Sequence, residues 1–230
     1  MRRLLSALAL VMPLAVLAAE PAPTKLEAVG PDPAIPSGTQ ALPAQELKVQ
    51  ASSSLCEGKG AKRTCHGPER LIDGVNATAW CEGAKEDGVG ESVTFELQTP
   101  QEVAALEVVP YYAKDMRRAE GNARPHEVLL QVGTERFEVS FPDHVMTVSA
   151  ENPTEGWRVE DGPCGDETCK TSQDERIAAG ESYSVVLPAP VKAQKVRLEL
   201  RSTHSGDKHS DTCMSAVRLR VRRAPPAKPE

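Results

Sequence analysis

Alternation of apolar and polar residues is the dominant pattern along the chain. Residues 195–201 (KVRLELR) and 217–222 (VRLRVR) alternate without interruption. In an extended strand this places the aliphatic side chains on one face and the charges on the other, as in half-buried antiparallel sheets. Similar patterns predict further strands over residues 47–51, 92–97, 104–109, 127–132, 136–141, 145–148 and 182–187.

The predicted strands are short, and clusters of Gly, Pro, Asn or Asp separate them. One short helix is expected around Leu71–Asp73, and no other convincing helical stretch occurs. Many short strands joined by such turns indicate an all-β fold. We therefore predict an antiparallel β-sandwich or jelly roll.

Other segments lack this alternation. Residues 1–19 carry two arginines, a short apolar run and small residues, which predicts a signal peptide and no membrane span once it is removed. Residues 20–45 are rich in Pro, Ala, Gly and Ser, which predicts a disordered or extended linker, and residues 223–230 predict a disordered tail. The sandwich is expected over 46–222. The polar segment 149–180 is expected to be a disulfide-pinned insertion between two strands.

Six cysteines lie beyond the leader, and an even number in an exported chain predicts disulfides. Cys56 with Cys65 and Cys164 with Cys169 would each close a small loop, which leaves Cys81 for Cys213. The alternative is a zinc site, but no C-x-x-C pair is present and no histidine has ligand spacing to two cysteines. The protein is therefore expected in the periplasm or outside the cell.

The balance of acidic and basic residues limits the classes of partner that the protein is expected to bind. The chain has 33 acidic and 27 basic residues, for a formal charge of −6. A nucleic-acid binder usually has a concentrated basic face, so no nucleic-acid partner is expected. The chain also has only two tryptophans, three tyrosines and three phenylalanines, so stacking surface for a ligand is scarce and each aromatic residue carries more weight.

Several short motifs occur together in a specific order. They are LIDG at 71–74, TAWCEG at 78–83, DGVGES at 87–92, GNARP at 121–125 and GDKHSDTCMS at 206–215. Together they resemble discoidin-like (F5/8 type C-like) galactose-binding-type domains, closest to the glycan-binding branch found with secreted NAD-glycohydrolases. The chain departs from that branch at Ala216, where an acidic residue is usual, and at Pro110, where a glycine is usual. The resemblance implies a galactose-binding-domain-like β-sandwich, here braced by disulfides, that binds glycans through its loops.

The aromatic residues in the matched loops are the first candidates for ligand contact. Trp80 offers a large apolar face and one N–H donor, although a buried core position at a strand end beside the Cys81 bridge is the favoured alternative. Tyr111 and Tyr112 follow an apolar strand and are candidates for a stacking platform. The alternative is that one of the two tyrosines packs in the interior.

Charged and polar residues complete the predicted ligand set. Arg124 and Asp211 lie in matched loops that the resemblance brings toward Trp80, and an Arg–Asp pair could bracket sugar hydroxyls or staple the loops together. Glu82 and Asn122 are the further candidates for ligand contact.

A calcium site is a second hypothesis for the acidic loop. Asp87 and Glu91 lie among glycines close to Glu82, so that carboxylates and backbone carbonyls could converge on Ca²⁺. Alternatively, the glycines only allow tight turns and the acids are solvated. The group His204, Asp207, His209 and Asp211 also has metal-binding side chains, but in the resemblance it is an ordinary loop.

No catalytic motif is present: there is no nucleophile elbow, no H-E-x-x-H and no phosphate-binding glycine loop. The sequence therefore predicts a non-catalytic module that binds carbohydrate of a cell surface or envelope. The alternative is a structural or interaction protein that docks an envelope protein. A hydrolase would need two carboxylates that face each other in a concave pocket. If Trp80, Arg124 and Asp211 are buried and satisfied, the ligand site must be sought among Tyr111, Tyr112 and the 149–180 insertion.

Overall fold

The structure is a computed structural model that describes residues 22–30, 35–143 and 181–222. The predicted signal peptide, the tail, the strand at 145–148, the insertion and the Cys164–Cys169 pair lie outside the described residues. Within them, no helix is long and apolar enough to cross a membrane.

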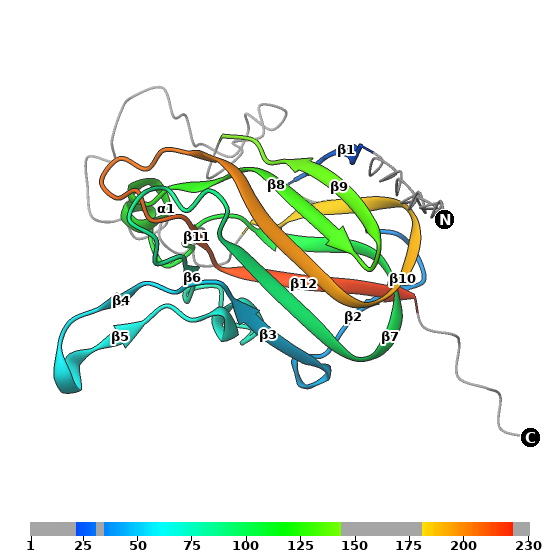
Figure 1. Cartoon of the computed structure of the whole chain (residues 1–230), viewed down its shortest axis with the longest axis horizontal. Coiled ribbons are helices and arrows are strands. Elements are labelled where there is room, and N and C mark those ends of the chain that lie inside the picture. The colour runs from blue at the N-terminus through cyan, green and yellow to red at the C-terminus, as the bar shows by residue number, and fades with distance from the viewer. Residues whose placement is uncertain (1–21, 31–34, 144–180, 223–230) are drawn as a thin grey trace, which may run out of the picture.

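Two long strands form the centre of the fold. β7 (Ser92–Val109) and β10 (Tyr183–His204) pair with each other antiparallel, with register shifts between Val186 and Val191 and between Ala193 and Lys195. Both strands turn at one end of the molecule and return in the opposite layer (Figure 1). The predicted strands 92–97 and 104–109 are therefore two halves of one strand, and 182–187 and 195–201 are two parts of another.

The two halves of each long strand have different neighbours, which creates the two layers. The first half of β7 pairs with β3 (Leu47–Ala51), and its second half pairs with β12 (Ala216–Arg222). The second part of β10 pairs with β8 (Arg124–Val132), which continues to β9 (Glu135–Ser140). This arrangement confirms the predicted antiparallel sandwich.

The core lies between the layers and is mainly aliphatic, although Trp80, Tyr183 and the three phenylalanines also belong to it. In β10, Val196, Leu198 and Leu200 are buried, and the charged residues between them are partly exposed, as the alternation predicts. Phe95 and Leu219 from the neighbouring strands join the same cluster. Burial of such a side chain stabilises the fold by about 1.5–3 kcal/mol, so this cluster dominates the stability of the sandwich.

Two strands lie in the segment that composition assigns to the linker. β1 (Thr24–Glu27) pairs in parallel with β9, and β2 (Thr39–Ala41) pairs antiparallel with β12. These are edge strands with mostly exposed side chains. Their pairing uses backbone N–H and C=O groups, which an apolar pattern does not report. The sandwich therefore begins before Glu46.

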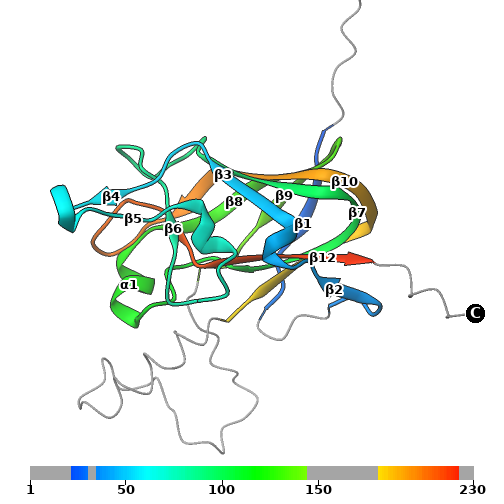
Figure 2. The same cartoon turned by 90° about the horizontal axis from the view of Figure 1, so that it is seen from below.

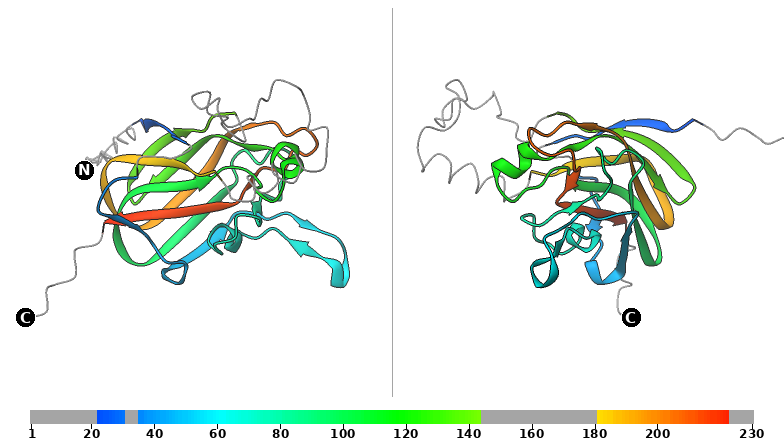
Figure 3. Two further views of the ribbon diagram at one scale, coloured as in Figure 1. Left: turned by 180° about the vertical axis from the view of Figure 1, so that it is seen from behind. Right: turned by 60° about the vertical axis from the view of Figure 1, so that its left-hand side comes forward.

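Short elements gather at one end of the sandwich (Figure 2). They are the hairpin of β4 (Cys56–Glu57) and β5 (Thr64–Cys65), the pair β6 (Trp80–Cys81) and β11 (Cys213–Met214), and helix α1 (Met116–Gly121). Three 3₁₀ turns occur at Ala44–Glu46, Gly60–Lys62 and Pro68–Leu71. The last of these turns lies where the short helix around Leu71–Asp73 is expected. The β4–β5 hairpin projects from this loop end (Figure 3).

Candidate functional site

A cavity of about 610 Å³ opens at the loop end. Its walls come from parts of the chain that are far apart in sequence: the β4–β5 hairpin and His66, the stretch between Arg70 and Cys81, the loop from Tyr112 through α1 to Asn122, and residues 208–211. We call this cavity the loop-end pocket. Ligand sites of proteins typically have volumes of about 300–1,000 Å³, so the pocket has the size of one.

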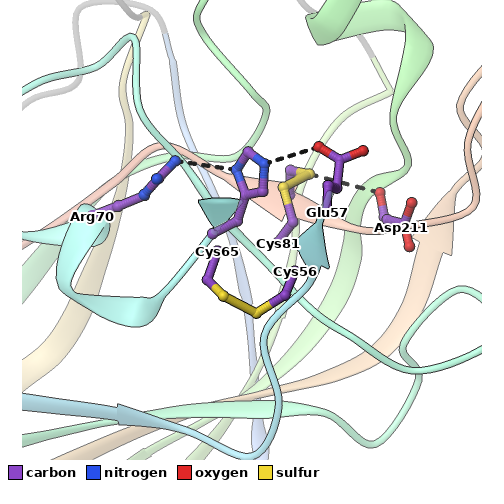
Figure 4. A network of polar contacts seen from close by, with 8 residues as sticks. Cys56, Glu57, Cys65, Arg70, Cys81 and Asp211 are labelled. Carbon is purple, nitrogen blue, oxygen red and sulfur yellow. Dashed lines mark hydrogen bonds and ion pairs between the residues drawn. A yellow bond between two sulfur atoms is a disulfide. The ribbon is translucent and has the colours of Figure 1, made fainter. Parts of the chain in front are cut away.

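Two disulfides hold the walls of the loop-end pocket in place. One joins Cys56 to Cys65 across the hairpin, and the other joins Cys81 of β6 to Cys213 of β11. Both pairs are those expected from loop length and from the remaining cysteines. The second disulfide lies beside Asp211, because Sγ of Cys213 is 3.8 Å from the backbone oxygen of that residue (Figure 4).

A polar chain of three side chains crosses the pocket wall (Figure 4). Nη1 of Arg70 lies 3.2 Å from Nδ1 of His66, and Nε2 of the same ring lies 3.4 Å from a carboxylate oxygen of Glu57. Arginine can only donate, so Nδ1 accepts and Nε2 carries the proton that faces Glu57. The buried imidazole thereby fixes the direction of the Glu57 carboxylate at the edge of the pocket.

Tyr112 lines the pocket, but its ring faces are not free. Only 8% of the residue is exposed. The His66 ring meets it edge-on with centroids 5.7 Å apart, and Cζ of Arg118 lies 5.8 Å from its centre. Burial raises the pKa of the Tyr112 hydroxyl, and the positive charge of Arg118 opposes that shift. The ring therefore supports a cation and leaves no flat platform for a sugar.

Helix α1 positions the cationic side of the pocket. The carboxylate of Asp115 caps the helix by accepting from the backbone N–H of Arg118 at 2.9 Å, and it also pairs with the Arg118 guanidinium. At the other end of the helix, Nδ2 of Asn122 donates to the Arg118 carbonyl at 2.8 Å. Asn122 lines the pocket, as does Asp211. These two and Tyr112 are the members of the predicted ligand set that the structure brings together.

Three other members of the predicted set belong to the interior. Trp80 is fully buried and its indole N–H donates to the Ser53 carbonyl at 3.0 Å. The Tyr111 hydroxyl is also buried, accepts from the backbone N–H of Glu181 at 2.8 Å, and has its pKa raised far above the usual range by burial. These residues cannot contact a ligand from outside, so the structure corrects their predicted role to that of scaffold.

Glu82 is the third buried member. Its carboxylate accepts from the backbone N–H groups of Thr212 at 3.0 Å and Ala84 at 2.6 Å. Burial raises the pKa of this carboxyl group, and the two backbone hydrogen bonds oppose the shift. Glu82 therefore joins the 206–215 segment to the loop after β6 and does not face the pocket.

Arg124 pairs with a different aspartate from the one expected. Its Nη2 lies 2.7 Å from Oδ1 of Asp143, and its Nη1 donates to the Ala119 carbonyl at 3.3 Å. In the antiparallel pairing of β8 with β9, Glu127 lies opposite Ser140. Continuing this register by three residues places Arg124 opposite Asp143. The hydrogen bond from Arg124 lowers the pKa of Asp143. The expected pair with Asp211 is thus replaced by an ion pair between the start of β8 and the segment that follows β9.

The acidic loop uses its carboxylates within the protein. Oδ2 of Asp87 accepts from the Thr203 hydroxyl at 3.2 Å, and Glu91 accepts from the Ser52 and Ser53 hydroxyls. Among the residues that the structure describes, no group of three or more His, Cys, Asp and Glu side chains could hold a metal ion. In the second candidate group, His204 turns away to the Phe141 carbonyl at 3.0 Å.

Most of the pocket's charge comes from residues that the sequence did not single out. The basic side chains that line it are Lys62, Arg70, Lys114, Arg117, Arg118 and Lys208. Their sequence signal is weak, because they are divided among four segments and overall net charge averages them with distant acids. The local runs KGAKR at 59–63 and KDMRR at 114–118 are the only traces of the cluster in the sequence.

An antiparallel sandwich of bent long strands, with a pocket formed by loops at one end, is the F5/8 type C, or discoidin-like, class of domain. More specifically, the chain belongs to the NAD glycohydrolase translocation F5/8 type C domain family, whose model matches residues 44–160. A comparison with curated proteins finds no match.

Solved structures match the chain at low sequence identity, and those with a TM-score above 0.5 share its fold. The CBM32-1 and CBM32-2 domains of Clostridium perfringens ZmpB match with a TM-score of 0.52 and 11% identity, over 89% of this chain and 43% of that one. The same domains in complex with GalNAc match with a TM-score of 0.52 and 10% identity, over 89% and 41%. The family 32 CBM of Clostridium perfringens NanJ in complex with galactose matches with a TM-score of 0.46 and 14% identity, over 79% and 98%.

Proposed function

We propose that this protein is an exported, non-catalytic binding module that takes carbohydrate in the loop-end pocket. The observation that carries the proposal is a pocket built from the loops at one end of an F5/8 type C sandwich. The ZmpB domains, which share the fold, have been solved in complex with GalNAc, and this supports a sugar as the kind of ligand.

The chemistry of the pocket suits a saccharide. Sugar hydroxyls both donate and accept hydrogen bonds, and the pocket offers acceptors at Asp211 and Glu57 and donors at Asn122 and the basic residues. His66 and the disulfide at Cys81 hold this lining rigidly, so little ordering is needed on binding.

A binding role fits the two pocket carboxylates better than hydrolysis does. The general acid of a glycosidase is usually a carboxyl group shielded from water. The Glu57 side chain is 68% exposed, and its carboxylate accepts from Nε2 of His66 at 3.4 Å. A reducing-end release assay tests this point, since turnover of any bound saccharide that disappears in Glu57→Gln or Asp211→Asn would contradict the non-catalytic proposal.

Export is supported by the disulfides, which persist in oxidising compartments. Fractionation of cells that produce the full chain, with alkylation of free thiols before lysis, tests it. We expect the protein in the periplasm or medium with unreactive cysteines. Reactive thiols in a cytosolic fraction would contradict this part of the proposal.

The ligand test is a glycan array followed by calorimetry, with and without Ca²⁺. Asp211→Ala should abolish binding of any saccharide found, and Glu135→Ala should not change it. Glu135 is the matched control because it is exposed at the β8–β9 turn, at the opposite end of β8 from Asn122. No saccharide bound under either condition, together with capture of an envelope protein that sugars do not compete for, would favour the interaction-protein alternative.

A further inference from the structure

The loop-end pocket is strongly cationic in a protein that is acidic overall. Six basic and two acidic side chains line it, whereas the whole chain has a formal charge of −6. The two acids are Glu57 and Asp211. If Asp115, which pairs with Arg118 just outside the lining, is counted with them, the excess of positive charge is still three. Such a concentration raises the local density of anions at the site.

The basic residues of the pocket fall into two groups. Arg70 and Arg118 are held by partners within the protein, His66 and Asp115. The other four are exposed, and within the described parts of the chain none of them has an ion pair with a carboxylate; they are Lys62, Lys114, Arg117 and Lys208. These four cations surround the pocket and have no assigned role in the fold.

Aromatic stacking cannot supply the affinity of this pocket. Tyr112 is its only aromatic lining residue other than His66 and His209, and the Arg118 guanidinium lies over its ring. The edge of His66 meets the same ring. Recognition must therefore come from hydrogen bonds and charge, and charge-assisted hydrogen bonds are the stronger of these.

We infer that the ligand is an acidic saccharide, one with carboxylate or sulfate groups, whose anionic groups are bound by Arg117, Lys114, Lys62 and Lys208. This inference rests on the proposed function and narrows it. Arginine binds carboxylate and sulfate oxygens with two parallel N–H donors, whereas lysine acts as a point charge. A neutral galactoside would leave these cations without a partner, so its affinity should be lower.

The experiment is calorimetric titration of the full mature chain with four probes. They are a tetragalacturonate, a sulfated galactotetraose, the neutral galactotetraose of the same linkage, and a single-stranded oligonucleotide of equal charge. We expect one of the acidic saccharides to bind at least about tenfold more tightly than the neutral one, with affinity that falls as salt rises. The first two probes distinguish carboxylate from sulfate.

The variants are Arg117→Glu and Lys208→Glu, with Lys195→Glu as the matched control. Lys195 is exposed and its carbonyl accepts from Gly133 at the far end of the sandwich, so the control makes the same change in net charge away from the pocket. Each pocket variant should weaken the acidic saccharide about tenfold, Arg117→Lys should recover part of the loss, and Lys195→Glu should have little effect. Thermal unfolding of each variant checks that the fold is intact.

The outcomes separate this inference from the proposed function. Equal binding of neutral and acidic saccharides, unchanged in Arg117→Glu and Lys208→Glu, would overturn the acidic ligand and keep carbohydrate binding. Tighter binding of the oligonucleotide than of every saccharide would overturn the inference by assigning the cations to a phosphate polymer. Absence of binding to all four probes would overturn the inference, and carbohydrate binding itself would be overturned only if the glycan array also shows no bound saccharide.

Discussion

Arg118 lies over the ring of Tyr112, with Cζ 5.8 Å from the ring centre. The same arginine is held by Asp115, which also caps helix α1. The aromatic residue best placed to stack against a sugar therefore serves as the base for a cation. Cation–π contacts contribute about 0.5–1 kcal/mol at exposed sites and more when they are shielded. In this pocket the contact of Arg118 with Tyr112 links the Asp115 cap of α1 to a residue that lines the pocket.

The hydroxyl groups of the three tyrosines should ionise only as the protein unfolds at alkaline pH. Burial raises the pKa of all three hydroxyls: that of Tyr183 to about 12, that of Tyr111 further, and that of Tyr112 above its usual range. A group whose folded pKa is raised stabilises the fold fully below its unfolded pKa of about 10 and loses this contribution as pH rises through the folded pKa. Stability should therefore fall above pH 10.

Absorbance at the tyrosinate band and far-UV circular dichroism, followed over the same alkaline range, check this prediction. We expect little tyrosinate at pH 10 in the folded protein and a single transition at higher pH. The urea-unfolded chain is the control and should be about half ionised near pH 10. Tyrosinate absorbance in the folded protein that matches the unfolded chain at pH 10 would contradict the burial of these hydroxyls.

Gly88→Ala should destabilise the protein more than Gly74→Ala. The two glycines have nearly the same positive φ, 76° and 77°. A Cβ on residue 88 would lie 2.4 Å from Cγ of Glu82, whereas one on residue 74 would meet nothing within 4 Å. Glu82 cannot move aside because two backbone N–H groups bind its carboxylate. An alanine with this positive φ costs about 1–2 kcal/mol of stability at either position. Overpacking against Glu82 adds about 1–3 kcal/mol at residue 88 alone.

Denaturant unfolding of the two glycine variants measures this difference directly. A double variant, Gly88→Ala with Glu82→Ala, should show positive coupling, because truncation of Glu82 removes the clash. Equal free energies of unfolding for the two single variants would show that the Glu82 contact does not constrain the loop.

The two described disulfides should contribute unequally to stability. Residues Cys81 and Cys213 are 132 apart in sequence, and Cys56 and Cys65 are 9 apart. The chain-entropy relation gives about 5 kcal/mol for the long loop and about 3 kcal/mol for the short one. Cys81→Ala with Cys213→Ala should therefore lower the unfolding free energy more than Cys56→Ala with Cys65→Ala.

Binding provides a second readout for the two disulfides. The hairpin variant should keep most of the stability and lose affinity for saccharide, because the hairpin contributes Glu57 and Lys62 to the pocket. If the hairpin variant binds as the native protein does, that wall takes no part in recognition.

Asp143→Asn should reduce the sensitivity of the protein to acid. The hydrogen bond from Arg124 lowers the pKa of Asp143 below its usual range. A carboxyl group with a lowered folded pKa stabilises the fold above its unfolded pKa of about 3.9, and this contribution disappears as pH falls through the folded pKa. The native protein should therefore exceed the variant in stability at pH 6, and the difference should shrink toward pH 2.

Thermal unfolding across this pH range measures the effect of Asp143. The effect should be small, because the side chain of Asp143 is 61% exposed and water screens the pair. Glu135→Gln serves as the control for loss of one exposed carboxylate. A difference between native protein and Asp143→Asn that does not change with pH would contradict the ion pair with Arg124.

The sandwich could be predicted because its evidence is local. Alternation at 195–201 and 217–222 places every second residue in the core, and Leu198 and Leu219 are buried accordingly. β1 and β2 gave no such signal, because they pair through backbone groups at the sheet edge. Helix α1 has six residues, too few for an apolar period, and depends on the Asp115 cap.

The candidate site was less predictable because the loops have small cores of their own. Tyr111 packs with Val109 and Ala119 in one cluster, and Tyr112 packs with Cys81 and Cys213 in another. An aromatic residue in a loop is therefore not necessarily exposed. The pocket itself combines residues from 55 to 211, and neither spacing nor overall charge reveals which of them meet.

The Cys81–Cys213 bridge also imposes an order of events on biosynthesis. Cys56, Cys65 and Cys81 emerge from the ribosome long before Cys213, and of these three only Cys56 and Cys65 have their native partner at hand during that time. Residues 208–211 form the part of the pocket lining that is latest in the sequence. They emerge from the ribosome just before Cys213 and strand β12. The pocket therefore forms only after residues 208–213 have emerged, and a chain stopped short of residue 213 lacks the bridge that holds this wall in place.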